Sequence, residues 1–415
     1  MLVNRTPTPS MLAHGNVALC LLLIVLAAAL VGCGDDAARA GTDSGTDRSS
    51  APGILPRVAA ALTLEQVTTI AGDEAAFGRV GGVLADGDGS IYVSDELAQE
   101  IRVFDSTGRP LRTLGARGDG PGEFRGLGAM AWSGDELAAL DLRQRRVTIF
   151  DLERDTIGTQ NWPSAGGMPF RLYPAGSEVY AAGTFQHSQQ GFSSAAEAAR
   201  EFREPAVRYF SFPEAGATPS FLAIADSVVE PHGFDCDGER NHTIELFSEP
   251  LFGRAEPLRA FTGPGQLAVA SRVNYRIDLI DVSSGDTART IQRDYPRRLV
   301  TDAAWERATR DMRERERVSG PLDCGPDGVR PDSLPPIRSV IADESGRLWI
   351  EAATPDGFAI TVVDSVGRML GEAPLPPRDD RVPLYARNER LYLVSVDDLG
   401  VQSIHIFAVQ LPDPD

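Results

Sequence analysis

The 415-residue sequence predicts an all-β protein built from antiparallel strands. Short segments alternate between apolar and polar residues with a period of two, which is typical of strands with one buried face. Polar turns separate these segments at short spacing, in keeping with the 41 Gly and 29 Pro of the chain. The order of strands and turns also recurs along the chain, and such recurrence indicates a repeat architecture.

The repeat is clearest in three units, at residues 83–115, 129–159 and 339–371. Each unit runs through a strand of small residues, a polar turn, a strand with an apolar centre, a loop and a further strand. Weaker copies complete the set at residues 171–183, 260–291 and 384–411. A four-stranded sheet cannot bury its faces alone, so the six units must stack on one another. The sequence therefore predicts a six-bladed β-propeller of four-stranded antiparallel blades.

The two ends of the repeat region predict how the ring closes. Residues 67–89 parallel residues 111–135, so residues 62–71 should form the outermost strand of a blade. The last unit, residues 382–411, ends before an outer strand of its own. We expect the N-terminal strand to complete that last blade, which closes the ring without a covalent bond and removes an open sheet edge.

The segment LADGDGSIYVSD, residues 84–95, is either a calcium loop or a tight turn between two strands. At the matching positions the other units have SGDE, DESG, PAGS, GPGQ and RNER, which keep turn-forming residues but not the aspartates. An EF-hand loop that began at Asp86 would need a bidentate carboxylate at its twelfth position, which is Leu97. We therefore expect a hairpin turn in which glycine supplies a positive φ and aspartate accepts bonds from its own backbone.

The N-terminus has the pattern of a secretory signal. Arg5 precedes an apolar run from Val17 to Val31. This run is shorter than a membrane-spanning helix, which needs about 20 residues. The run ends in LVGC, which resembles the lipobox of bacterial lipoproteins, in which Cys33 would be lipidated and become the mature N-terminus. An ordinary cleaved signal and a short membrane anchor are the alternatives.

This resemblance implies a signal peptide at residues 1–32 and a lipidated flexible tether at 33–55, which precede the propeller at 56–415 that the repeat predicts. The tether consists of Gly, Ser, Ala, Thr and Asp with almost no apolar residue, so it cannot bury enough surface to fold. Gly34 follows the lipidated position, and in enteric-type sorting this implies the outer membrane rather than the inner one. We expect the protein at the bacterial cell envelope, anchored through its lipid and facing either the periplasm or the exterior.

Charge and cysteine content narrow the class of partner and the redox environment. The formal net charge of −19 makes a nucleic-acid partner unfavourable, because a phosphate backbone would be repelled. Cys236 and Cys324 are the cysteines that remain in the mature chain beside Cys33. In an oxidising compartment this pair predicts one disulfide, with two free thiols or a metal site as alternatives. Both cysteines lie in polar segments that we expect to be loops.

Residues 115–124 and 141–151 resemble the repeat of NHL-repeat propellers, which has the form G-x-G-x-G-P-G-x-F and then D-x-x-N-x-R-[IV]-x-x-F. The second unit matches this form at Gly118, Gly120, Pro121, Gly122, Phe124, Asp141, Arg146, Val147 and Phe150. It has Gln144 where that family prefers Asn, and the first unit has Glu100 where Arg is expected. The whole chain also resembles the six-bladed β-propeller lipoproteins of environmental bacteria, a resemblance that implies no activity.

Two insertions interrupt the repeat, at about residues 186–206 and 301–336. Within the second, residues 301–317 predict an amphipathic helix that Thr301 caps and that has Trp305, Ala308 and Met312 along one face. This helix is either a strut on the flank of the propeller or a lid or docking element.

The chemistry-bearing residues do not form a recognised catalytic motif. The sequence has no G-x-S-x-G, no H-E-x-x-H and no Walker-type loop. The histidines of the mature chain lack metal-ligand spacing; they are His187, His232, His242 and His405, of which His232 and His242 are expected in a loop and His405 in a strand. We therefore expect no catalytic residue, no metal ligand and no cofactor, with calcium as the one ion that the acidic residues could hold.

Two functions remain open from the sequence. The first is a non-catalytic binding or scaffold propeller that presents loops to a protein, peptide or glycan at the cell envelope. The second is a calcium-dependent lactonase, other hydrolase or lyase with its ion in the propeller channel. The candidate binding residues lie in loops between strands and are Asp95, Arg125, Asp141, Arg143 and Arg145, although each of them could instead satisfy a blade turn.

Overall fold

The structure is a computed structural model, and the chain divides into two units, residues 1–48 and 49–415. The described residues all belong to the second unit: 53–55, 60–162, 168–176, 178–184, 207–212, 220–222, 232–237, 242–247, 258–271, 274–307, 309–310, 330 and 332–412. Within these ranges no helix is both long enough and apolar enough to cross a membrane.

The described residues form six blades of four antiparallel strands each, consecutive in sequence in five of the blades, which confirms the predicted all-β propeller. Blade 1 consists of β3 (Val80–Ala85), β4 (Ile91–Asp95), β5 (Glu100–Phe104) and β6 (Pro110–Leu114). Blade 2 consists of β9 (Leu127–Ser133), β10 (Glu136–Asp141), β11 (Arg146–Asp151) and β12 (Thr156–Asn161). Blade 3 consists of β13 (Met168–Ala175), β14 (Glu178–Thr184), β15 (Val207–Phe212) and β16 (Ser220–Leu222), and its outer strands are described by their backbone alone.

The second half of the ring repeats this arrangement. Blade 4 consists of β19 (Leu258–Gly263), β20 (Gln266–Ala270), β21 (Arg276–Asp281) and β22 (Thr287–Gln292). Blade 5 consists of β23 (Ile337–Ala342), β24 (Leu348–Thr354), β25 (Gly357–Val363) and β26 (Met369–Pro374). Blade 6 consists of β27 (Tyr385–Arg387), β28 (Arg390–Val396), β29 (Gln402–Gln410) and, from the N-terminal side, β2 (Thr63–Ile70). The first strand of each blade packs on the first strands of both neighbours, from β3 through β27 and back to β3.

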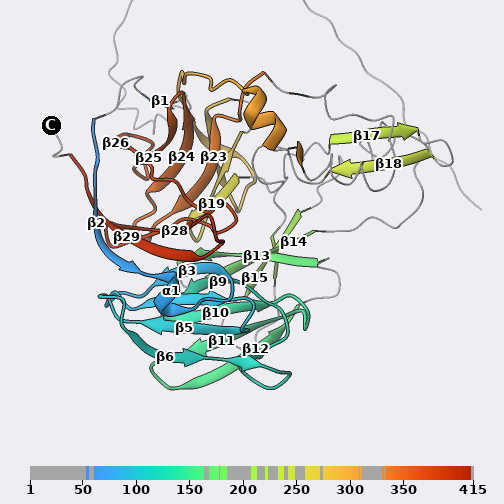
Figure 1. Ribbon diagram of the computed structural model, residues 1–415, viewed down its shortest axis with the longest axis vertical. Coiled ribbons are helices and arrows are strands. Elements are labelled where there is room, and N and C mark those ends of the chain that lie inside the picture. The colour runs from blue at the N-terminus through green and yellow to red at the C-terminus, as the bar shows by residue number, and fades with distance from the viewer. Residues whose placement is uncertain are drawn as a thin grey trace, which may run out of the picture. The chain divides into compact units, whose positions relative to one another are not determined.

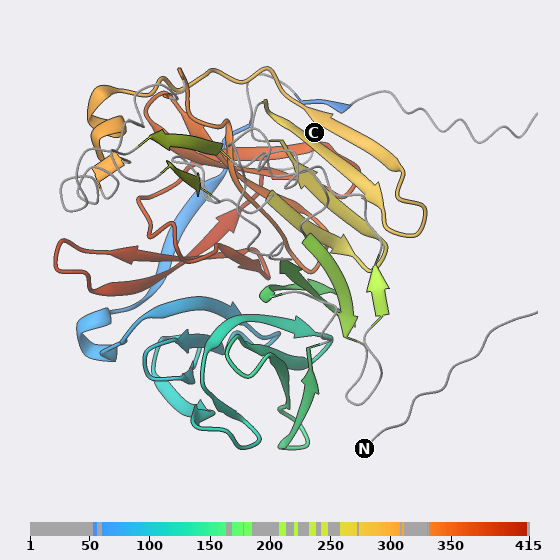
Figure 2. The same ribbon diagram turned by 90° about the vertical axis from the view of Figure 1, so that its right-hand side faces the viewer.

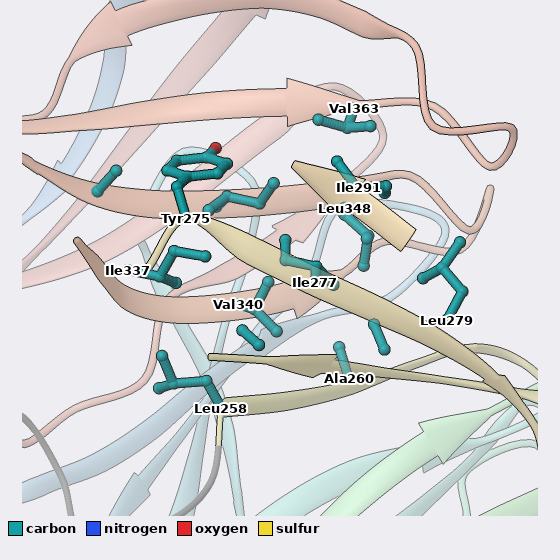
Figure 3. Close-up of a cluster of buried hydrophobic side chains, with 14 of the residues drawn as sticks. Leu258, Ala260, Tyr275, Ile277, Leu279, Ile291, Ile337, Val340, Leu348 and Val363 are labelled. Atoms are coloured by element: carbon teal, nitrogen blue, oxygen red, sulfur yellow. The ribbon is translucent and has the colours of Figure 1, made fainter. Parts of the chain in front are cut away.

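A cluster of buried apolar side chains fills the space between each pair of neighbouring blades. Figure 3 shows the cluster between blades 4 and 5, where Ile277 and Leu279 of β21 face Val340 of β23 and Leu348 of β24. Alternate residues of a strand therefore enter two different clusters, as in β24, where Trp349 packs toward blade 6 and Ile350 toward blade 4. The second strands, such as β4 and β24, are nearly apolar on both faces because both of their faces are buried.

The N-terminal strand closes the ring as predicted. β2 pairs antiparallel with β29 from Thr63 opposite Gln410 to Ile70 opposite Ile404, and Figure 1 shows the blue β2 beside the red β29. A further strand, β1 (Gly53–Ile54), pairs parallel with β22, the outer strand of blade 4. Between β1 and β2, the chain is bonded to Glu372 on β26, the outer strand of blade 5. Leu62 N donates to Glu372 O, and Glu372 N donates to Ala60 O. Residues 53–55 thus pair with blade 4 and residues 60–62 with blade 5, and we name these two segments together the strap.

The turn at Asp86 is one of five with the same geometry. In each, the first residue is aspartate, its backbone N–H donates to the carbonyl four residues later, and the glycine three residues on has a positive φ. These turns begin at Asp86, Asp105, Asp343, Asp364 and Asp397. At Asp86 the carboxylate accepts from Ser90 N at 2.8 Å and from the Tyr92 hydroxyl at 3.0 Å. The aspartate therefore organises a hairpin, as the sequence predicts.

The histidine of the closing blade predicts a pH dependence of stability. His405 on β29 is partly buried, its Nε2 lies 2.8 Å from Ser395 Oγ, and burial lowers the pKa of its imidazole. The folded state therefore favours neutral His405, so its contribution to the free energy of unfolding is present above pH about 6.5 and is lost as the pH falls below that value. We expect denaturant unfolding between pH 5 and 8 to show a smaller acid-induced loss for His405→Gln than for the parent chain. Equal losses in the two proteins would contradict this assignment.

Candidate functional site

The two ends of the ring are built differently. Because each blade is antiparallel, the turns between its first and second strands share one end with the turns between its third and fourth strands. We name this end the turn face. The loops between second and third strands, and the connections from one blade to the next, share the other end, which we name the connection face.

The turn face is held together by contacts between turns of successive blades. Gly134 N donates to Gly176 O at 3.0 Å and so joins blades 2 and 3. The Asn388 side-chain amide donates to Gly87 O at 3.3 Å, while Asn388 N donates to Glu344 Oε1 at 2.8 Å. Blade 6 is thereby joined to blades 1 and 5. These bonds fix the turns against one another, so this end of the ring offers little freedom for a ligand-binding loop.

The longest segments between blade strands all leave from the connection face. Residues 185–206 join the second and third strands of blade 3. Residues 223–257 lead from blade 3 to blade 4 and include the hairpin of β17 (His232–Asp237) and β18 (His242–Phe247). Residues 293–336 lead from blade 4 to blade 5. The loops between the second and third strands of blades 1, 2 and 6 are short. The long insertions therefore lie within blade 3 and in the connections that join blades 3, 4 and 5.

The predicted helix lies in the last of these segments. The chain is helical at residues 302–307 and 309–310, and Thr301 Oγ1 accepts from Ala304 N at 3.2 Å, so Thr301 caps the helix as predicted. Trp305 is buried, and Thr309 Oγ1 donates to its carbonyl oxygen. Ala308, Met312 and the remainder of the predicted helix to residue 317 lie outside the described residues, as does the insertion at 186–206.

Asp95 and Asp141 are buried at equivalent places, where the second strand of blades 1 and 2 ends. The carboxylate of Asp95 accepts from the backbone N–H groups of Gly78, Arg79, Leu97 and Ala98. That of Asp141 accepts from those of Arg125, Gly126, Arg143 and Gln144. Each carboxylate ties the loop of its own blade to the connection that enters the blade. Four backbone donors satisfy each of them, so both are turn anchors.

The three candidate arginines lie around the anchor at Asp141. Arg125 pairs with Asp119 at 2.8 Å, and this pair lowers the pKa of Asp119. Arg143 and Arg145 are exposed, and Arg145 has a positive φ of 52°. The structure thus brings Arg125, Arg143 and Asp141 together on blade 2, whereas Asp95 serves blade 1.

Two neighbours of these arginines explain the repeat motif of blade 2 in physical terms. The Gln144 side-chain amide donates to Gly118 O at 2.9 Å, and Arg146 donates to the carbonyls of Gly120 and Glu123 at 2.8 and 2.6 Å. Phe124 from the same glycine-rich loop is fully buried between blades 1 and 2. Asp141 therefore accepts from backbone N–H groups of this connection, while Gln144 and Arg146 donate to its carbonyl oxygens.

A charged cluster on blade 5 was not predicted from the sequence. Glu351 of β24 is completely buried, and it accepts from Arg338 at 3.2 Å and from Arg378 at 3.2 and 2.5 Å. Arg338 also pairs with the exposed Asp380 at 2.8 Å. A glutamate within the otherwise apolar strand LWIEAAT was the one sequence feature that could have indicated this cluster. Its partners lie 13 and 27 residues away in the sequence, so no local pattern connects them.

An aromatic ring extends this cluster toward the surface of the connection face. The guanidinium of Arg338 lies 4.3 Å from the centroid of the Phe358 ring, and that of Arg298 lies 5.2 Å from it. Arg298 also donates to Gly357 O at 2.8 Å. Residues from two blade connections and one blade therefore converge here, and the contacts fix their positions by charge and by cation–π attraction.

The structure corrects one prediction about the cysteines and histidines and leaves others outside its range. Cys236 lies in β17 opposite Thr243, while His232 and His242 begin β17 and β18, so the predicted loop is wrong at these residues. The polar residues around them favoured a loop, but the two segments pair as an antiparallel hairpin whose strands are joined by backbone hydrogen bonds. Cys33, Cys324 and the pairing of Cys324 with Cys236 lie outside the described residues. Among the residues that are described, no three His, Cys, Asp or Glu side chains gather as a metal site.

Comparison with protein families supports the fold. The family described as a 6-bladed beta-propeller, DUF5128, matches residues 70–210, which run from the end of β2 into blade 3. No curated protein matches the chain.

Solved structures similar to this chain are propellers of low sequence identity. A Bacteroides fragilis protein described as exported is 12% identical with a TM-score of 0.48, covering 87% of this chain and 99% of its own. A DUF4221 family member from Bacteroides vulgatus is 11% identical with a TM-score of 0.44, over 85% and 99% of the two chains. Virginiamycin B lyase from Staphylococcus aureus is 10% identical with a TM-score of 0.43, over 84% and 99%.

Proposed function

We propose that this chain is a lipid-anchored β-propeller of the bacterial cell envelope that binds a protein, peptide or glycan through its connection face. The observation that carries the proposal is that the long segments at 185–206, 223–257 and 293–336 all leave their blade strands at that end of the ring. Loops on a rigid scaffold are where proteins concentrate their binding residues. The turn face, in contrast, is fixed by bonds between its turns.

The roles of the anchoring side chains support binding without catalysis. Asp95 and Asp141, the two carboxylates that a channel enzyme could have used, have their oxygens occupied by backbone N–H groups. Glu351 is occupied by two arginines. The proposal therefore assigns no cofactor to the protein, and it assigns to Cys33 the lipid that holds it at the membrane.

The proposal is tested by photo-crosslinking in intact cells, with benzophenone side chains placed at one exposed position at a time. Arg143 and Asp356 represent the connection face, and Asp135 and Val366 represent the turn face. We expect adducts with an envelope peptide, protein or glycan from the first two positions and none from the second two. The same positions combined with Cys33→Ser should lose these adducts, because the protein is then no longer held beside its partner.

Two results would contradict the proposal. One is crosslinking from Asp135 and Val366 at the same level as from the connection face. The other is one calcium ion per chain together with calcium-dependent turnover of a lactone or ester, which would establish the enzyme alternative instead.

A further inference from the structure

Exposed apolar side chains gather at one place on the connection face. In the part of the chain that the structure describes, nine large apolar side chains are exposed, and four of them lie in or next to the loops of two neighbouring blades. These four are Leu97 in blade 1 and Val396, Leu399 and Val401 in blade 6. Leu399 is 88% exposed at the tip of its loop. A grouping of this kind on a soluble domain marks an interaction site more often than scattered single residues do.

The segment that leads from blade 6 into blade 1, residues 71–79, lies between these two loops and includes α1 (Gly72–Ala75). It touches both: a Cβ on Gly72 would lie 2.8 Å from Val401 Cγ1, and one on Gly78 would lie 2.9 Å from Leu97 Cβ. Figure 2 shows α1, in blue, close to the tip of the dark red β28–β29 hairpin. The four side chains therefore lie on the two sides of one connecting segment, and we name them together with that segment the 6–1 surface.

Hydrogen bonds hold the 6–1 surface in a fixed shape. Gly72 N donates to Ser403 Oγ at 3.0 Å, and Val80 N donates to Gln402 Oε1 at 2.7 Å, so the connecting segment is bound to blade 6. Glu96 N donates to Arg79 O at 2.8 Å, so the same segment is bound to the loop of blade 1. A preformed apolar surface needs little ordering when a partner binds, which favours affinity.

Acidic residues outnumber basic ones around the apolar side chains of this surface, which Arg117 and Arg102 also reach, donating to Leu97 O and Ala75 O. The segments 71–79, 95–99 and 396–402 contain a single basic residue, Arg79, which pairs with Glu96 at 2.8 Å. The remaining exposed charges of these segments are all negative, at Asp73, Glu74, Asp397 and Asp398. Such a rim attracts a cationic partner and repels anionic lipid or an identical surface on a second copy of the chain.

We propose that the 6–1 surface binds a protein segment in which apolar side chains are flanked by arginine or lysine. This inference deepens the proposed function and rests on it, since it names the partner for one part of the connection face. Leu399 and Leu97 would insert between apolar side chains of the segment, and the acidic rim would pair with its basic flanks. The side chains at the centre of such a surface supply most of the binding energy.

The test measures binding of a 12-residue peptide, with leucine and phenylalanine between pairs of arginines, to the full-length chain in mild detergent by fluorescence anisotropy. We expect the double variant Leu97→Ala with Leu399→Ala to raise Kd by about tenfold or more. Leu111→Ala is the matched control, because Leu111 is also exposed but lies on the outer strand of blade 1. Glu74→Gln with Asp398→Asn should weaken binding at low salt and make it less dependent on salt.

Each other outcome overturns the inference. Binding that is insensitive to Leu97 and Leu399, or equally sensitive to Leu111, would place the peptide elsewhere. Self-association that Leu399→Ala abolishes would make a second copy the occupant, and binding to anionic vesicles would make it a membrane. If the peptide fails to bind while the connection face still crosslinks in cells, the inference fails and the proposed function stands.

Discussion

Replacing Glu351 by glutamine should lower the free energy of unfolding by about 3–5 kcal/mol. Glu351 has no exposed side-chain surface, and Arg338 and Arg378 both donate to it. A glutamine side chain has nearly the shape of glutamate but carries no charge. The guanidinium groups of Arg338 and Arg378 would therefore remain between blades 5 and 6 without their main counter-charge. Uncompensated charge in a buried place is among the largest single destabilising effects that a substitution can cause. Urea denaturation followed by tryptophan fluorescence measures the change.

Asp380→Asn is the matched control for Glu351, because Asp380 also pairs with Arg338. Its side chain is 64% exposed, so solvent screens the pair and we expect a loss of at most about 1 kcal/mol. Similar losses from the two substitutions would show that burial does not determine the effect. The assignment of Glu351 as the centre of the cluster would then be wrong.

Replacing Gly346 by alanine should destabilise the protein by about 2–5 kcal/mol, the sum of two separate effects. Gly346 has a φ of +74° in the turn that begins at Asp343, and a side chain costs about 1–2 kcal/mol in that conformation. A Cβ at Gly346 would also lie 2.6 Å from the carbonyl oxygen of Thr262 in blade 4. Because that neighbour is backbone, relief requires blades 4 and 5 to separate at their turns.

Gly285→Ala separates the two effects. Gly285 has almost the same φ, +76°, but no atom lies within 4 Å of the place where its Cβ would stand. We expect this variant to lose only about 1–2 kcal/mol, and thermal unfolding of both variants against the parent chain provides the comparison. Equal losses would mean that contact between the turns of blades 4 and 5 contributes nothing.

The blade pattern could be predicted because it is local. Alternation with a period of two fixes which residues form strands, and recurrence of the pattern fixes their grouping, so the six repeat units correspond to the six sheets. Closure by residues 62–71 was also predictable, since the last unit lacked an outer strand and β2 supplies it. The hairpin of β17 and β18 was missed because its residues are polar, and pairing between the two strands outweighs their weak strand propensity.

The candidate site was less predictable because it depends on long-range contacts. Asp95 and Asp141 were candidate binding residues that could instead satisfy a blade turn, and only the positions of four backbone N–H groups show that each is a turn anchor. Glu351 was overlooked because its counter-charges come from a preceding strand and a following connection. The 6–1 surface likewise needs blade 6 beside blade 1, and these blades come from opposite ends of the repeat region.

The strap, residues 53–55 and 60–62, has a mechanical consequence. A pull on the chain that precedes Gly53 acts first on β1 and on the bond from Leu55 N to Gln292 O at 2.7 Å. It then reaches the two bonds at Glu372, and only afterwards β2, where the register with β29 extends over the whole strand. The hydrogen bonds of the strap would break one after another. Each broken bond would lengthen the free chain before the force reaches β2, the strand that closes the ring. The strap would therefore yield to a pull on the chain before Gly53 ahead of the strand that closes the propeller.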